Sequence, residues 1–193
     1  MAISYPLAYP SSLRVARVQW RGVSASSRNV SPYTLQTQQY NWSGQGWMGD
    51  VQCPPLGISD AETLIAWLLS AQRGTFYFKD PSYAGLRGSI TGTLTTATAV
   101  ANTSTLTFTN TGSGSFALGD WLQISTSLYK VIQVNSATSV DLFPVLRQNY
   151  SSAAITISSP QGVFRLASPS TDWSVELARI YGVSFSIVEE IAQ

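Results

Sequence analysis

The 193-residue sequence contains no histidine and a single cysteine, Cys53. Without histidine, the Ser-His-Asp and Cys-His mechanisms of nucleophilic catalysis are unavailable. One cysteine cannot form an internal disulfide, and without histidine it leaves no ordinary zinc or copper site. We therefore expect a protein that is not an enzyme and has no catalytic residues, no metal site and no cofactor.

Charge is also scarce, because charged residues make up only 11% of the sequence and the net charge is +1. A chain this close to neutral is not expected to attract nucleic acid as a whole. No carboxylate precedes Asp50, whereas Arg14, Arg17, Arg21 and Arg28 all do. This asymmetry indicates either a sparsely charged edge that faces solvent or a basic face that meets an acidic partner or passing DNA.

Long apolar runs are missing as well. No stretch approaches the length of a membrane span, and the segment 1–10 lacks both the basic leader and the apolar core of a signal peptide. We therefore expect no membrane insertion and no signal peptide.

Ten acidic residues keep carboxylate chemistry open in principle. Glu189 and Glu190 are adjacent on a predicted strand, so their side chains should point to opposite faces. Asp172 and Glu176 would share one face of another predicted strand, but no partner motif accompanies them. A glycosidase would need two carboxylates facing each other across a cleft, and no spacing in the sequence indicates such a pair.

The sequence predicts one α-helix between Ser59 and Arg73. Ser59 precedes Glu62 by three residues, which is the pattern of a capping box. Gly74 predicts a left-handed stop after the helix. The apolar residues that recur at helical spacing between these ends are Leu64, Trp67, Leu68 and Ala71.

Most of the remaining sequence is typical of β-structure. Before the helix we predict a strand over 13–23 with a bulge near Ala16, followed by a polar loop over 24–32. Two further strands, 33–42 and 47–53, flank the sequence Ser43-Gly44-Gln45-Gly46, which predicts a hairpin turn there. After the helix, 75–79 is a predicted strand.

The composition changes at Gly88. Residues 88–161 are dense in Thr and Ser, and their short strands follow one another at a spacing typical of a small barrel or sandwich. We therefore predict a mainly β fold in which this segment is an inserted module. The discontinuous first domain would comprise residues 1–87 plus 162–193. The clearest strands from Gly88 onward are 105–109, 120–125, 128–134, 139–143, 153–157, 163–167, 172–178 and 181–188.

Two catalytic-looking motifs do not have the context that their chemistry requires. Gly44–Gly49 matches G-x-G-x-x-G, but a dinucleotide site needs a helix directly after it, and Asp50–Pro55 cannot form one. Ser127–Lys130 matches S-x-x-K, which needs both residues on one helical turn. The segment is a predicted strand, where residues three apart point to opposite faces.

Aromatic residues in the predicted module allow two interpretations. Trp121, Tyr129 and Tyr150 could stack on a sugar ring, which would make the module a binder of host carbohydrate. The favoured interpretation is packing in the core, since aromatic residues occur in strands for packing alone.

Short phrases over about two thirds of the chain resemble the distal tail proteins of long-tailed, non-contractile bacteriophages. Around the helix they are Tyr40, Trp42, Gly44, Trp47, Pro54–Leu56, Ala61, Leu64, Trp67, Leu68, Arg73–Phe76, Asp80-Pro81 and Arg87-Gly88. Later in the chain they are Gly119–Ile124, Leu128–Val131, Pro144–Arg147 and Phe164–Leu166.

The resemblance implies a tail-tube-like β-sandwich or split barrel with one flanking helix, carrying the inserted all-β module. It implies a hexameric ring at the tail tip of a virion, assembled in the host cytoplasm. Such a ring connects the tail tube protein to the baseplate hub protein and fibres. The tape measure protein, and later the DNA, pass through its lumen without specific binding.

We place the ring or partner interface at Arg14, Arg17, Arg21, Trp42 and Trp47. The alternatives are another component with the tail-tube fold, such as a tube or terminator subunit, and the carbohydrate-binding module considered above.

Overall fold

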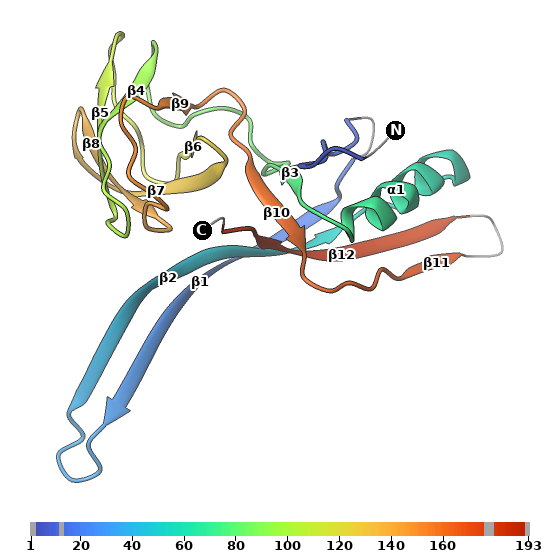
Figure 1. Ribbon diagram of the computed structural model, residues 1–193, viewed down its shortest axis with the longest axis horizontal. Coiled ribbons are helices and arrows are strands. Elements are labelled where there is room, and N and C mark those ends of the chain that lie inside the picture. The colour runs from blue at the N-terminus through green and yellow to red at the C-terminus, as the bar shows by residue number, and fades with distance from the viewer. Residues whose placement is uncertain (1–2, 12–13, 176–179, 192–193) are drawn as a thin grey trace.

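Twelve β-strands and one α-helix form the described part of the chain, which covers residues 3–11, 14–175 and 180–191 of this computed structural model (Figure 1). The prediction of a mainly β fold with one helix is confirmed. The elements are β1 (Arg17–Val30), β2 (Thr37–Gln52), α1 (Ile58–Ala71), β3 (Phe76–Phe78), β4 (Leu94–Thr98), β5 (Thr105–Asn110), β6 (Trp121–Ile124), β7 (Ser127–Ser136), β8 (Ser139–Phe143), β9 (Ala154–Thr156), β10 (Gly162–Leu166), β11 (Trp173–Val175) and β12 (Tyr181–Glu189).

A six-stranded antiparallel sheet contains the strands at the two ends of the chain. Its order is β1-β2-β12-β10-β3, and β11 pairs with the first residues of β12. β12 alternates as its sequence predicts, because Val183, Phe185 and Ile187 are buried while Ser184 and Ser186 are exposed. α1 packs against this sheet with Ala61, Leu64, Ile65, Trp67, Leu68 and Ala71.

The middle of the chain forms a closed barrel with the strand order β4-β5-β8-β7-β6-β9. All six strands lie inside the segment 88–161, and they enclose their own apolar cluster, with Leu106 and Leu122 fully buried. Two barrel side chains, Trp121 and Leu128, belong instead to the core of the sheet. The barrel therefore packs on the sheet, and the division into domains stays a prediction.

The largest departure from the predicted structure is the hairpin before the helix. β1 and β2 form one long ribbon, paired from Arg17 opposite Gln52 to Val30 opposite Thr37, and the chain reverses over 31–36. The predicted polar loop 24–32 is mostly strand, and the predicted turn lies inside β2. Figure 1 shows this ribbon projecting from the sheet.

The turn signal at Ser43–Gly46 marks a bulge instead. The pairing shifts from Ser24 opposite Gln45 to Ser26 opposite Asn41, so three residues of β2 lie opposite Ala25 alone. Extra residues in one strand bend a ribbon, and glycine within a strand favours such a site. Near Ala16, the Ala16 N–H bonds to the Gln52 carbonyl oxygen at 2.9 Å although Arg17 is the residue opposite Gln52, so two residues of this strand lie against one, as in the bulge predicted there.

Both predicted helix caps are wrong. α1 begins at Ile58 with Gly57 as its N-cap, and no side chain caps it, so Ser59 and Glu62 form no capping box. Leu56 and Tyr181 exchange two backbone hydrogen bonds just before the helix, which sets where the chain enters it. Gly74 does not have a positive φ. Its missing side chain instead makes room for the Tyr5 ring, which a Cβ at this position would overlap.

The other predicted strands are present within one or two residues at most ends. β4 was not predicted, and two of the predicted segments extend beyond the described residues. The strand predicted over 13–23 includes residue 13, and the strand predicted over 172–178 includes residues 176–178, all of which lie outside the described residues. Glu176, and with it the predicted pair with Asp172, therefore lies outside the described structure. None of the described helical residues forms a segment of the length and apolarity that crossing a membrane requires.

Candidate assembly interface

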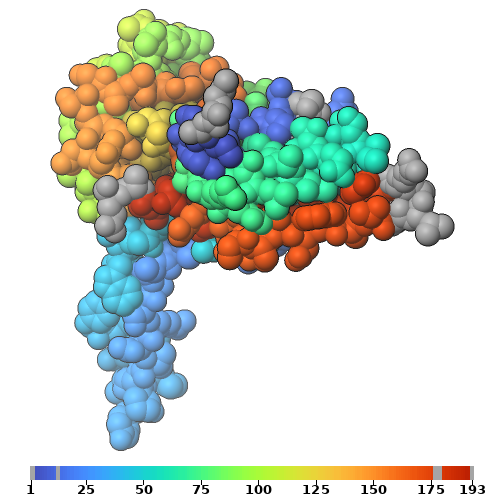
Figure 2. Space-filling view, turned by 45° about the vertical axis from the view of Figure 1, so that its right-hand side comes forward, coloured from blue at the N-terminus to red at the C-terminus, as the bar shows by residue number. Residues whose placement is uncertain are grey.

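The part of the β1–β2 ribbon from the bulge to the tip, residues 24–44, is here called the arm. None of its residues is buried, and only Ser27 and Ser31 are even partly covered. Figure 2 shows the arm standing clear of the rest of the molecule. A two-stranded ribbon without a covering layer is at best marginally stable in water, so the arm lacks the burial that normally holds strands together.

The arm carries little charge and presents large side chains to solvent. Arg28 is its only charged residue. Neighbouring polar side chains bond along the strand, as in the contact of Gln39 Nε2 with Asn41 Oδ1 at 2.9 Å. The exposed apolar and aromatic residues, with their exposed fractions, are Val30 (51%), Tyr33 (94%), Leu35 (76%), Tyr40 (50%) and Trp42 (57%).

The tip of the arm is a defined loop. The Ser31 N–H donates to the Gln36 carbonyl oxygen at 2.9 Å, and the Leu35 N–H donates to the Ser31 carbonyl oxygen at 3.0 Å. Leu35 has a φ of 54°, a left-handed conformation that an apolar residue seldom adopts. The loop therefore holds Tyr33 and Leu35 outward at the end of the arm, at a conformational cost.

A second open surface is the sheet face that α1 leaves uncovered. On β1 it carries Arg17, Gln19 and Arg21, which alternate with partly buried residues. Asp50 and Ser186, on the neighbouring strands, line a shallow hollow of this face. The face is thus polar, with charges of both signs and few of either.

Asp50 is the one carboxylate on the β2 portion of this face, and it forms two contacts. Ser186 Oγ donates to Asp50 Oδ1 at 2.6 Å, and the Arg21 guanidinium pairs with Asp50 Oδ2. The hydrogen bond from Ser186, followed by the contact with Arg21, lowers the pKa of Asp50. Arg21 is therefore neutralised locally, whereas Arg17 forms no ion pair within the described residues.

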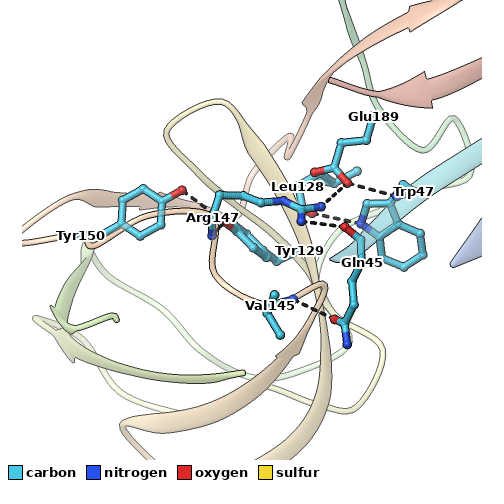
Figure 3. A network of polar contacts seen from close by, with 8 residues as sticks. All are labelled: Gln45, Trp47, Leu128, Tyr129, Val145, Arg147, Tyr150 and Glu189. Carbon is cyan, nitrogen blue, oxygen red and sulfur yellow. Dashed lines mark hydrogen bonds and ion pairs between the residues drawn. The ribbon is translucent and has the colours of Figure 1, made fainter. Parts of the chain in front are cut away.

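A buried ion pair joins the barrel to the sheet at the base of the arm (Figure 3). Arg147 Nη2 lies 2.6 Å from Glu189 Oε2, and the two side chains are only 9% and 3% exposed. Arg147 Nη1 donates to the Gln45 carbonyl oxygen at 2.6 Å, and the Trp47 N–H donates to Glu189 Oε2 at 3.0 Å. Burial raises the pKa of the Glu189 carboxyl, against the opposing effects of Arg147 and the Trp47 N–H.

Two further hydrogen bonds hold the arm base to the barrel. The Val145 N–H donates to Gln45 Oε1 at 2.9 Å, and Trp47 Nε1 donates to the Leu128 carbonyl oxygen at 3.0 Å. Residues 45–47 directly follow the bulge in β2. The barrel therefore fixes the strand from which the arm departs.

Four of the five predicted interface residues are exposed: Arg14, Arg17, Arg21 and Trp42. Arg17 and Arg21 lie on the open sheet face, and Trp42 lies in the bulge at the root of the arm. Their role in an interface stays a prediction.

Trp47 is wrong as a surface contact, because it is 7% exposed. Its ring packs 4.9 Å from that of Trp121 and 5.0 Å from that of Phe143. An indole inside this aromatic cluster is a core residue of the junction between barrel and sheet, and it is not accessible to a partner.

The predicted sugar-stacking residues are also wrong. Trp121, Tyr129 and Tyr150 are 6%, 0% and 7% exposed, so none offers a ring face to a ligand. Lys130 Nζ lies 4.5 Å from the centre of the Trp121 ring, and the Tyr129 and Tyr150 hydroxyls lie 3.1 Å apart. These aromatic residues pack the core, as the favoured interpretation held.

Sequence analysis missed the arm tip and the Arg147–Glu189 pair. Glu189 did give a signal, because it continues the buried alternation of Val183, Phe185 and Ile187. A carboxylate at a buried position of this alternation requires a charged or hydrogen-bonding partner. As predicted, Glu190 points away from Glu189, and it pairs with Arg165 at 3.2 Å on the other face.

Comparison with known proteins adds no family assignment. A scan against models of protein families matches none of them, and a search of curated proteins finds no match. Within the described residues, no three His, Cys, Asp or Glu side chains gather where they could hold a metal ion. The geometry of the arm and the sheet is therefore the main support for a functional proposal.

Proposed function

We propose that this chain is a structural protein of a phage virion that forms a ring at the distal end of the tail. In this role, copies of the chain assemble side by side around an open lumen. The ring connects the tail tube to the baseplate hub and fibres and lets the tape measure protein and DNA pass. The tail-tube-like identity of the sheet and helix is part of the proposal.

The exposure of the arm is the main support for this proposal. It exposes large apolar side chains on a ribbon with no covering layer, and the outer edge of β1 pairs with no other strand of the described chain along its 14 residues. An open strand edge pairs readily with other chains unless it is covered. A neighbouring copy in a closed assembly would cover both the edge and the arm.

The open sheet face supports a lumen. Most of its side chains are short or polar, with Val23 and Met48 as the exposed apolar exceptions, and Arg21 is neutralised by Asp50. DNA binding strengthens with each phosphate that a protein neutralises, so a conduit needs a lining with little excess positive charge. The closed barrel is an addition that a plain tube subunit would not need, which favours the tail-tip role over the tube or terminator alternative.

Native mass spectrometry and cryo-electron microscopy of the purified chain test the proposal. We expect six copies in a ring with a central hole. In a matched short-arm variant, an Asn-Gly turn replaces residues 25–44. Because Ser24 and Gln45 lie directly opposite each other, a two-residue hairpin loop fits between them.

The short-arm variant should keep the circular dichroism and thermal transition of the full chain while remaining monomeric. A full-length chain that stays monomeric at every concentration, with no ring in the micrographs, would overturn the ring itself. Rings formed equally well by the short-arm variant would leave assembly standing but would remove the arm from it.

A further inference from the structure

A second exposed apolar surface lies beside α1, and we call it the α1–β11 patch: Ile58, Glu62, Leu69, Trp173 and Val175. The exposed fractions of its four apolar side chains are 44% for Trp173, 46% for Leu69, 51% for Ile58 and 55% for Val175. The patch is therefore unlike the rest of α1, whose other large apolar residues are buried in the sheet core.

The three helix residues of the patch lie along one side of α1, because spacings of four and seven residues bring side chains to the same side. The C-terminal end of that side lies near β11. Gln72, one turn beyond the stripe, donates from Nε2 to Thr171 Oγ1 at 2.9 Å, two residues before β11. At the other end, both backbone groups of Tyr181 bond to Leu56, so the helix begins on the side of β12 that is away from β11.

Trp173 and Val175 continue the helix-covered face of the sheet past the helix. Trp173 lies opposite Val183 and Val175 lies opposite Tyr181, and both partners are buried. Residues directly opposite in a strand pair share a face. The helix stripe and the strand pair therefore border one strip, and Figure 2 shows α1 and β11–β12 against each other.

The charges of the arm and the patch are complementary. Glu62 is the only charged residue of the patch and is exposed, whereas Asp172 lies on the opposite, open face of the sheet, where it lines the same hollow as Asp50. The only charge on the arm is that of Arg28. An aromatic ribbon with one cation thus matches an apolar strip that carries one carboxylate.

We propose that the arm of one copy docks on the α1–β11 patch of the next copy in the ring, an inference that rests on the proposed function. The arm and the patch lie at opposite ends of the molecule (Figure 1), so one copy cannot join its own two surfaces. A contact between two different surfaces is heterologous, and such contacts close into rings when the rotation between copies permits it.

Mixing two defective variants tests this contact. The arm variant carries Tyr33→Ser and Leu35→Ser, and the patch variant carries Trp173→Ser and Val175→Ser. A second patch variant, Ile58→Ser with Leu69→Ser, covers the case in which the short β11 does not tolerate its changes. The matched control removes two exposed apolar residues from the barrel instead, Val100→Ser and Leu118→Ser, which are 51% and 60% exposed.

Each arm or patch variant alone should lose the ring, and the barrel control should keep it. In a mixture, the patch variant still has an intact arm and the arm variant still has an intact patch. One contact can form and the chain of contacts then ends, so native mass spectrometry should find a one-to-one dimer and no larger species. Circular dichroism confirms that each variant is folded.

Patch variants that still form rings would overturn this inference and leave the proposed ring intact. Folded arm and patch variants that stay monomeric after mixing would overturn it in the same way. A wild-type chain that never forms rings would overturn the proposed function and this inference together.

Discussion

The buried pair of Arg147 and Glu189 gives a quantitative prediction for the junction that orients the arm. Arg147→Met would leave the Glu189 carboxylate, only 3% exposed, with the Trp47 N–H as its one remaining partner. Glu189→Met would leave the guanidinium equally isolated. Breaking a buried pair by removing one partner costs about 3–5 kcal/mol. Each single variant should therefore lose about that much free energy of unfolding.

The double variant should lose less than the sum of the two single changes. It removes both charges, and a well-packed apolar replacement of a buried pair is often close to neutral. Two backbone groups, the Trp47 N–H and the Gln45 carbonyl, would still lose a partner, at about 1–3 kcal/mol each. We therefore expect a coupling energy of about 0.5–3 kcal/mol between the two sites.

Urea unfolding followed by tryptophan fluorescence measures these differences, because Trp20, Trp47 and Trp121 pack together at this junction. The matched control is Arg165→Met, which removes the cation of the exposed neighbouring pair with Glu190. Exposed pairs contribute about 0–1 kcal/mol, so this control should change stability little.

The pH dependence separates the two single variants. Burial raises the pKa of Glu189, so the folded state holds a proton on this carboxyl more tightly than the unfolded chain does. In Arg147→Met the loss should shrink as the pH falls from about 8 to about 5, because protonation removes the unpaired charge. In Glu189→Met the loss of stability should not shrink over this pH range, because arginine stays charged. Single variants within about 1 kcal/mol of the wild type, or a purely additive double variant, would refute this account.

Two smaller predictions follow from single side chains. Cys53 is buried, and burial raises the pKa of its thiol, so a thiol reagent at neutral pH should react with it only after urea unfolding; rapid reaction of the native chain would contradict this. Asp50 has a lowered pKa, so the stability that it adds is present above the unfolded pKa of about 3.9 and is lost as the pH falls further. The difference between the wild type and Asp50→Asn should accordingly narrow in acid, and a constant difference down to about pH 2 would show that the carboxylate is not stabilised.

The sequence predicts those elements whose side chains alternate between a core and solvent. β12 and α1 were found because a buried face imposes a period on the residues. The arm has no buried face, so it imposes no period, and its serine and glutamine residues resemble a loop. Register is weakly specified in strands of this kind. The glycines at 44 and 46 then favoured a turn at a position where the ribbon bends but does not reverse.

The candidate site was harder to predict, since its parts meet only in the folded chain. In the sequence, Glu189 follows Arg147 by 42 residues, and Gln45 precedes Arg147 by 102 residues. No local spacing links them. Trp47 shows the same limit, because an indole near glycines could equally be an exposed contact or a core residue, and only the position of the barrel decides between them.

The position of the ion pair has a consequence for assembly. Docking a flexible ribbon would cost conformational entropy for each residue that becomes ordered. Here the strand leaves the body at residues 45–47, where Arg147, Val145 and Leu128 hold it by backbone and side-chain bonds. The bulge at 42–44 then sets the bend in one step. Because the barrel fixes the root of the arm, much of the arm's direction is set before any partner binds. Docking that covers Tyr33, Leu35 and the open edge therefore loses less conformational entropy than docking of a freely moving ribbon would.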